Sequence, residues 1–156
     1  MMNKSQKKEY IDNMKNQFSK FDAVIVTHYQ GLNVNQLDDL RAKMRDHGIQ
    51  FKITKNRITK LALENTKCKE LKDLFTGPTA VALSEDAIMS AKILTKFSKE
   101  NQNLKILGGI MGSEILDAAG VNNVATLPTL DEARAKIVGI LSSPAQKIAS
   151  ILLAPA

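Results

Sequence analysis

Residues 49–63 restrict the fold more than any other segment, because they join a strand pattern directly to a helix pattern. Apolar Ile49, Phe51 and Ile53 alternate with polar residues, which is typical of a strand that turns one face to a core. After this strand the apolar residues take helical spacing instead. We therefore expect a strand that runs at once into a helix.

The same two patterns alternate along most of the chain, and apolar stripes mark the face that each helix is expected to bury. Strands are expected at residues 23–29, 49–54, 80–83 and 104–107, and helices at 5–20, 34–47, 56–65, 67–75 and 84–99. The expected stripes are Tyr10, Ile11, Met14, Phe18 and Phe21; then Val34, Leu37, Leu40 and Met44; then Ile58, Leu61 and Ala62; and finally Ile88, Ala91, Leu94 and Phe97. Gly108 and Gly109 predict a bulged or tightly packed end of the last strand.

The helix at 34–47 carries two adjacent carboxylates, Asp38 and Asp39. Arg41 and Lys43 follow at the spacing of helical ion pairs, so we expect Asp38–Arg41 and Asp39–Lys43 pairs on the exposed side. Consecutive helical residues diverge by about 100°, so the two carboxylates do not share one site. A catalytic dyad is therefore not expected here.

The chain changes character near Leu127, and we take residues 1–127 as the main domain and 128–156 as a tail. Thr129 and Glu132 have the spacing of a capping box at a helix start. Pro144 is expected to begin a second helix, so the tail is predicted as two short amphipathic helices. Their apolar faces could fold back on the core or meet helices of a partner, and the sequence alone favours neither.

Four cations gather where the strand at 49–54 meets its helix. They are Lys52, Lys55, Arg57 and Lys60. A helix start already presents unpaired backbone N–H groups and a partial positive charge, here near Asn56, so it favours anions. Repeated phosphates along a polymer fit such a junction better than one small ligand does.

The charge of the chain is also unevenly placed. Residues 1–60 hold twelve Lys and Arg against six Asp and Glu, which accounts for the whole net charge of +6. This asymmetry points to a polyanionic partner, although a scattered, solvated basic surface explains composition alone equally well. Lys7 and Lys8 on the first helix could contact a phosphate, and a solvated first turn explains them as well.

Membrane and secreted classes are poorly supported. The apolar runs are only a few residues long, far short of the roughly 20 that span a bilayer, and no signal-peptide core follows the basic start. Cys68 is the only cysteine, so neither a disulfide nor a cysteine-based zinc cluster is expected. A cytoplasmic protein without cofactors fits best.

The sequence holds no recognisable catalytic constellation. His28 and His47 are far apart, and the glycines at 108, 109 and 112 match neither phosphate-loop nor dinucleotide-binding patterns. His28 could stack on or hydrogen-bond RNA, but a structural role is favoured. Exposed aromatic residues for base stacking are not expected, so recognition should come from cations, backbone amides and shape.

Several short motifs occur in an order that resembles a known family. They are Gln30-Gly31-Leu32-Asn33-Val34 before a helix with Leu40-Arg41, then Lys55-Asn56-Arg57-Ile58-Thr59, Gly77-Pro78-Thr79-Ala80, and Leu127-Pro128-Thr129. Individually they are weak, but together they resemble the bacterial large-subunit ribosomal stalk-base proteins, which are related to the acidic stalk protein P0 of archaea and eukaryotes. The similarity runs from about Asp22 to the C-terminus.

The resemblance implies an α+β fold, a two-layer sandwich with a ferredoxin-like sheet and packed helices, followed by a short helical tail. It also implies a non-enzymatic role as a structural constituent of the large ribosomal subunit. Such a protein binds ribosomal RNA at the GTPase-associated centre, beside a neighbouring RNA-binding stalk-base protein, and forms the base of the stalk that brings GTP-bound translation factors. The expected RNA-binding residues are Lys52, Lys55, Asn56, Arg57, Lys60, Gln30, Gly31, Gly77, Pro78, Thr79, Lys7 and Lys8.

In the family, a C-terminal helical spine docks dimers of the acidic stalk protein. Here Ser143–Pro155 looks like the run-up to that spine, and the sequence stops where the dimer-binding helix is expected to continue. We interpret this as truncation, and Ile148, Ile151 and Leu152 are the residues left to contact the dimers.

Two other functions are weighed against this reading. A DNA-binding regulator would use the helices at 34–47 and 56–65, but the strand between them breaks helix-turn-helix spacing. A small enzyme would bind a phosphorylated metabolite at the Asn56 helix start, and the missing acid–base pair argues against it.

Overall fold

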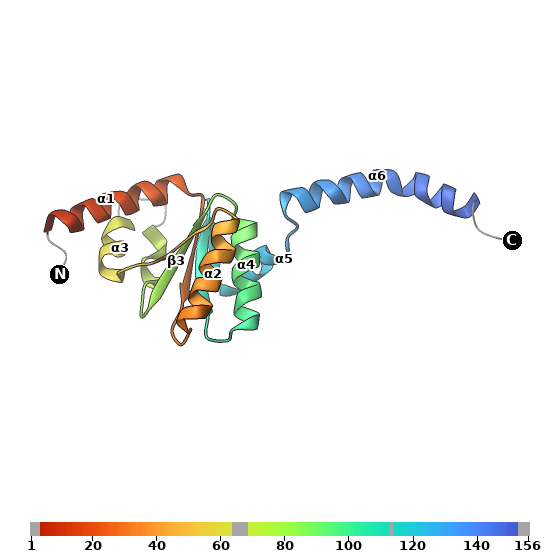
Figure 1. Cartoon of the computed structure of the whole chain (residues 1–156). Helices are drawn as coiled ribbons and strands as arrows, with labels where there is room; N and C mark the ends of the chain where they lie inside the picture. The colour runs from red at the N-terminus through yellow and green to blue at the C-terminus, as the bar shows by residue number, and fades with distance from the viewer. Residues whose placement is uncertain (1–3, 64–68, 113, 153–156) are drawn as a thin grey trace. The chain divides into compact units, whose positions relative to one another are not determined.

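The computed structural model describes residues 4–63, 69–112 and 114–152 (Figure 1). These residues belong to two compact units of the chain, which meet between Thr126 and Leu127. The elements of the first unit, in chain order, are α1 (Lys4–Lys20), β1 (Ala23–His28), α2 (Val34–Asp46), β2 (Gln50–Ile53), α3 (Asn56–Leu63), the 3₁₀-helix η1 (Lys69–Leu74), β3 (Thr79–Ser84), α4 (Ala87–Glu100), β4 (Lys105–Met111), β5 (Glu114–Asp117) and α5 (Ala118–Thr126). The second unit contains α6 (Leu130–Leu152).

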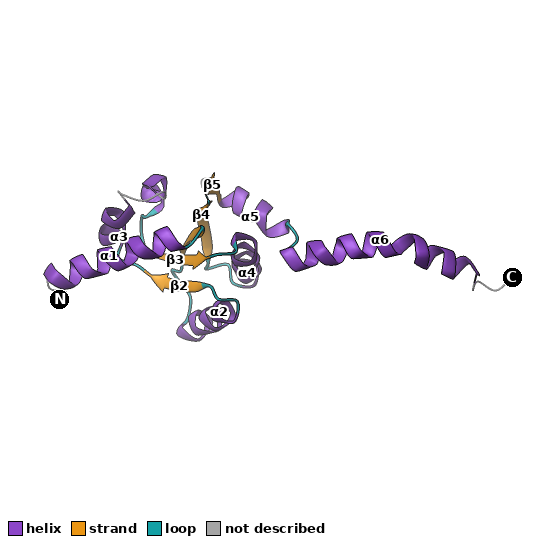
Figure 2. Ribbon diagram, turned by 90° about the horizontal axis from the view of Figure 1, so that it is seen from above, coloured by secondary structure: helices purple, strands orange, loops and turns teal. Residues whose placement is uncertain are grey.

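The described strands form one antiparallel sheet in the order β2-β3-β1-β4-β5. The first four strands and the helices α2 and α4 that connect them have the order of a ferredoxin-like fold. The expected α+β class, with helices packed on such a sheet, is therefore confirmed. Figure 2 shows this sheet with helices on either side of it.

Side chains of alternate strand residues pack into two apolar cores, one on each face of the sheet. Val24, Val26, Val81 and Leu83 pack against residues of α1, α3 and η1. Ile25 and Ala82 point the other way, into the core made with α2, α4 and α5. The helices α1 and α3 with η1 thus add a cover to the face of the sheet that α2 and α4 leave bare.

Most residues that were expected to face a core are buried or half-buried, and three are exposed. Val34 is 72% exposed because it is the first residue of α2, before the buried Leu40 and Met44. Leu61 is 48% exposed, since α3 buries Thr59, Ala62 and Leu63 instead. Ile53 is 40% exposed at the end of β2, an edge strand. For these three residues the predicted inward orientation was wrong.

The paired glycines lie inside β4 rather than at its end. The register against β1 shifts between Val26 and Thr27, which leaves an extra residue in β4 beside Gly108. A Cβ on Gly109 would lie 2.6 Å from the carbonyl oxygen of Val24, so the two strands approach too closely for a side chain. The bulged, tightly packed strand is confirmed, and the strand continues to Met111.

Two further parts of the chain differ from expectation. The sequence assigned no elements between Gly109 and Leu127, where β4 continues and β5 and α5 follow. In the second unit α6 is one helix with Pro144 inside it, so the prediction of two helices was wrong. The reciprocal hydrogen bonds between Thr129 and Glu132 confirm the expected cap of this helix.

Candidate nucleic-acid interface

One end of the sheet brings together segments that are far apart in the sequence. His28, the last residue of β1, is paired with Thr79 at the start of β3 and with Lys105 at the start of β4. The backbone N–H of Thr54, just after β2, donates to the carbonyl of Thr79 at 3.5 Å. The junction between β2 and α3 therefore lies at this same end.

The side chain of Asn56 fixes the loop before β3 to the start of α3. Its Nδ2 donates to the carbonyl oxygen of Gly77 at 2.6 Å. Its Oδ1 accepts a hydrogen bond from the hydroxyl of Thr79, which is 1% exposed. Asn56 thus holds two segments in register across 21 and 23 residues of chain.

Gly77 is required by this loop for two reasons. Its φ of +71° lies in the left-handed region that side chains rarely adopt. A Cβ there would also lie 3.0 Å from the ring carbon Cε1 of His28. The imidazole of His28 therefore packs closely over the glycine and joins the end of β1 to this loop.

The turn at Gln30 and Gly31 is held to the segment before β4. Asn103 Nδ2 donates to the carbonyl oxygen of Gly31 at 2.7 Å, and Gly31 has a φ of +92°. Gln30 lines a cavity of about 270 Å³ together with His28, Gln102, Asn103 and Lys105. The expected Gln30-Gly31 site is thereby placed beside a cation, Lys105, that sequence analysis did not select.

We use the name sheet-end surface for the residues gathered at this end. They are His28, Gln30, Gly31, Lys55, Asn56, Arg57, Lys60, Gly77, Pro78, Thr79, Asn103 and Lys105. Lys55, Arg57 and Lys105 are exposed, and Lys60 is half-buried one turn after Arg57. Asn103 and Lys105 escaped the sequence analysis because only the register of β4 against β1 brings them here.

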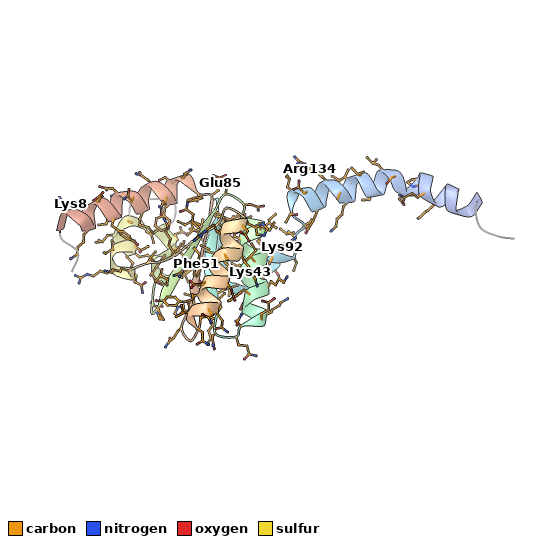
Figure 3. All side chains as sticks on the ribbon, viewed as in Figure 1. Lys8, Lys43, Phe51, Glu85, Lys92 and Arg134 are labelled. Carbon is orange, nitrogen blue, oxygen red and sulfur yellow. The ribbon has the colours of Figure 1, made fainter. Side chains whose placement is uncertain are left out.

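The remaining predicted RNA-binding residues lie elsewhere. Lys52 is half-buried on the edge strand β2, three residues before Lys55. Lys7 and Lys8 are exposed on α1, which packs with α3 in one core, and Figure 3 labels Lys8 on this helix.

The residues expected to bind a partner belong to α6. Ile148, Ile151 and Leu152 lie in this helix, but their side chains are outside the described residues. Earlier in α6, Ile137, Val138, Ile140 and Leu141 are all more than half exposed. The described part of α6 thus has an apolar surface that the tail itself does not cover.

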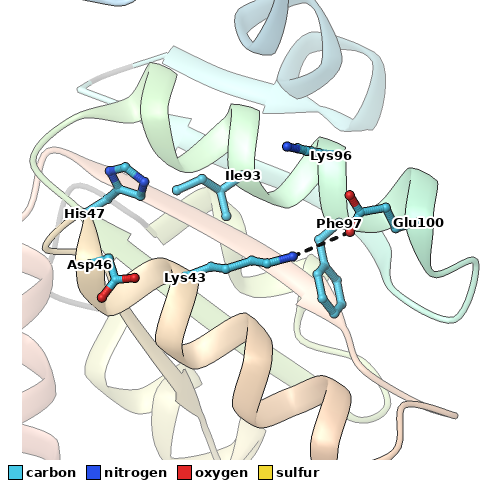
Figure 4. Close-up of a pocket in the computed structure, with 7 residues that line it drawn as sticks. All are labelled: Lys43, Asp46, His47, Ile93, Lys96, Phe97 and Glu100. Atoms are coloured by element: carbon cyan, nitrogen blue, oxygen red, sulfur yellow. Dashed lines mark ion pairs between the residues drawn. The ribbon is translucent and has the colours of Figure 1, made fainter.

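A separate cavity of about 260 Å³ lies between α2 and α4 (Figure 4). Lys43 crosses it, with its Nζ 3.6 Å from a carboxylate oxygen of Glu100 and 5.6 Å from the centre of the Phe97 ring. Lys43 therefore pairs with Glu100 instead of the predicted Asp39, whereas the predicted Asp38–Arg41 pair is present at 3.0 Å. This cavity is lined by residues of α2, α4 and the residue after α2, and none of them belongs to the sheet-end surface.

No three His, Cys, Asp or Glu side chains in the described ranges gather as metal ligands would. None of the described helices combines the length and the apolar character that a membrane crossing requires.

Comparison with known proteins gives a consistent answer. Residues 2–99 match the model of a family described as ribosomal protein L10. The chain is 69% identical over 153 residues to the large ribosomal subunit protein uL10 of Pelagibacter ubique, which covers 98% of this chain and 92% of that protein. It is 46% identical to the protein of the same name from Rhodospirillum rubrum, over 99% of this chain and 90% of the relative. The counterpart from Paramagnetospirillum magneticum is 50% identical over 95% of this chain and 86% of its own length.

Proposed function

This chain belongs to the ribosomal protein L10 family of structural proteins at the stalk base of the large ribosomal subunit, and we propose that its sheet-end surface binds ribosomal RNA. The RNA is that of the GTPase-associated centre, which the family resemblance implies. The bound state also places the chain beside the neighbouring RNA-binding stalk-base protein. Its location is the cytoplasmic ribosome, and its role is that of a scaffold without catalysis.

The observation that carries this proposal is the side-chain tie from Asn56 to Gly77 and Thr79. It holds the cation-rich start of α3 and the loop at 77–79 together at one end of the sheet. Phosphates can then be met by Lys55 and Arg57 and by backbone groups near the start of α3. The junction of β2 and α3 alone would offer the RNA one contact segment, and the loop at 77–79 adds a second one beside it.

The affinity comes mainly from charge, and the specificity comes from RNA shape. Neutralising phosphates releases counterions, so binding should weaken steeply as salt rises. Folded RNA is recognised through its backbone and tertiary shape more than through stacked bases on this surface. The glycines at 31 and 77 permit the left-handed turns that shape this surface.

The tail has a second proposed role in the same assembly. The exposed apolar residues of α6 fit a helix that docks dimers of the acidic stalk protein. Ile148, Ile151 and Leu152, later in α6, are the residues proposed to contact these dimers. Co-purification of this chain with the acidic stalk protein tests this role, and failure to form a complex would contradict it.

The RNA role is tested with Lys55, Arg57 and Lys60 replaced together by Ala. Binding to an RNA fragment that spans the GTPase-associated centre is measured over a range of salt concentrations. The triple variant should bind more weakly, and the slope of log affinity against log salt should fall by about 2 to 3, about one unit for each lost phosphate contact. A control variant with Ala at Lys96, Lys99 and Arg134 loses the same charge and should bind as the parent does. Unchanged affinity and slope in the first variant would rule out the proposed surface.

A further inference from the structure

A second basic surface lies along the open edge of the sheet, between α2 and β2. Six residues line a cavity of about 210 Å³ there, and they are Arg41, Arg45, Ile49, Gln50, Phe51 and Lys52. We call this the edge groove. Phe51, labelled in Figure 3, packs partly against the core that contains α2 residues, so this groove has an apolar side chain among its cations.

The charged residues that line the edge groove are all cations. Three of its six lining residues are cations, and none is acidic. Arg41 and Arg45 are four residues apart on α2, so they project from the same side of the helix. Asp38 pairs with Arg41 at 3.0 Å, but both side chains are well exposed, so the pair is weak and leaves other guanidinium N–H groups to donate.

The edge groove is continuous with the sheet-end surface along the chain. Lys52 belongs to the groove, and Lys55 and Arg57 follow at the start of α3. Since β2 pairs only with β3 in the described sheet, no strand covers its outer side. A polymer bound at the sheet end therefore finds further cations along β2 and then on α2.

We propose that the edge groove binds a second stretch of the phosphate backbone of the same ribosomal RNA, with Arg41, Arg45 and Lys52 as its phosphate ligands. This inference rests on the proposed function, since it extends the RNA contact beyond the sheet-end surface. Charge complementarity and continuity with that surface select a polyanion as the occupant. Arginine suits this role because its planar fork can donate two hydrogen bonds to one phosphate.

The test compares two double variants of the full chain. R41Q/R45Q removes two charges from the edge groove and one i,i+3 ion pair with Asp38. The control R134Q/K136Q removes two charges from α6 and the equivalent i,i+3 pair of Arg134 with Asp131. Binding to the RNA fragment of the GTPase-associated centre is measured for both across a salt series, and thermal unfolding confirms that both are folded.

R41Q/R45Q should weaken RNA binding by about tenfold or more at low salt, and its salt slope should fall by about 1.5 to 2. The control should retain the parental affinity and slope. R41K/R45K keeps the charge, so it should recover most of the salt slope and only part of the affinity.

If R41Q/R45Q binds the RNA as the parent does, the inference about the edge groove is overturned. The proposed RNA role of the sheet-end surface still stands if the Lys55, Arg57 and Lys60 variant binds the RNA more weakly. Failure of the parent chain to bind the RNA overturns the proposed function as well. The groove could instead receive an acidic peptide strand paired to the edge of β2. Two results together would establish the peptide as the occupant and contradict our RNA proposal. A glutamate-rich peptide would protect the Gln50–Ile53 amides from hydrogen exchange, and R41Q/R45Q would bind RNA as the parent does.

Discussion

Asn56 accepts a hydrogen bond from the buried hydroxyl of Thr79, and so the first residue of α3 is fixed to the first residue of β3. The same amide donates to Gly77 at 2.6 Å. Both hydrogen-bonding ends of one side chain are therefore engaged within the protein. Asn56 acts on RNA mainly by positioning the cationic helix start and the glycine loop.

Replacing Asn56 with Ala should destabilise the fold by about 1–3 kcal/mol, because a buried hydroxyl loses its acceptor. It should also weaken RNA binding, since the loop at 77–79 is no longer tied to α3. Denaturant unfolding and RNA titration measure the two effects. Asn122→Ala is the control, because Asn122 accepts from Thr95 at an exposed site, at 3.3 Å. If Asn56→Ala matched this control in both measurements, the positioning role would be excluded.

Gly77 and Gly48 form a matched pair, since both have a φ of +71°. A Cβ at Gly77 would lie 3.0 Å from His28, whereas nothing lies within 4 Å of one at Gly48. Ala at either position should cost about 1 kcal/mol of backbone strain. Gly77→Ala should cost more in thermal unfolding and should also weaken RNA binding, because it displaces His28 at the sheet end. Equal loss of stability and equal RNA affinity in the two variants would show that the His28 contact is unimportant.

Thr54 and Thr79, two buried threonines near this site, should respond differently to replacement by Val. Thr54 is 7% exposed, and its hydroxyl oxygen has no hydrogen-bond partner among the described residues. Thr54→Val should therefore be neutral or slightly stabilising, since it removes an unpaired polar group. Thr79→Val should cost about 1–2 kcal/mol, because Asn56 loses a donor. Chemical denaturation of both variants decides the matter, and a marked destabilisation by Thr54→Val would mean that its hydroxyl is satisfied in solution.

The sequence predicts this fold well wherever a local pattern decides the outcome. The alternation at Ile49 and Phe51 and the helix start at Asn56 depend only on near neighbours, and the structure contains both. The short strand β5 and the helix α5 escaped because the long strand β4 that precedes them runs through two glycines, which disfavour strands locally. Close packing against Val24 overrides that preference at Gly109.

The membership of the sheet-end surface was only partly predictable for a related reason. Lys105 and His28 are 77 positions apart, and they meet through the pairing of β1 with β4. The bulge beside Gly108 shifts that register by one residue, which no local pattern in the sequence specifies. Long-range register therefore decides which cations share this site.

Pro144 interrupts the hydrogen bonds of α6 without ending the helix. Proline has no N–H, so the carbonyl of Ile140 loses its usual donor four residues later. The neighbouring Ser142 hydroxyl donates to the carbonyls of Val138 and Gly139 at 2.9 and 3.2 Å. Pro144→Ala should restore the missing hydrogen bond and stabilise the helix by up to about 3 kcal/mol. Amide hydrogen exchange should then slow on both sides of residue 144.

Pro128→Ala is the matched control for this change, since Pro128 lies before the first residue of α6. It should leave the exchange rates within the helix unaltered. If α6 docks a partner as one continuous helix, Pro144→Ala should also keep or strengthen binding to dimers of the acidic stalk protein. Loss of that binding with slower exchange would mean that the partner requires a break at Pro144, and the single-helix docking mode would have to be abandoned.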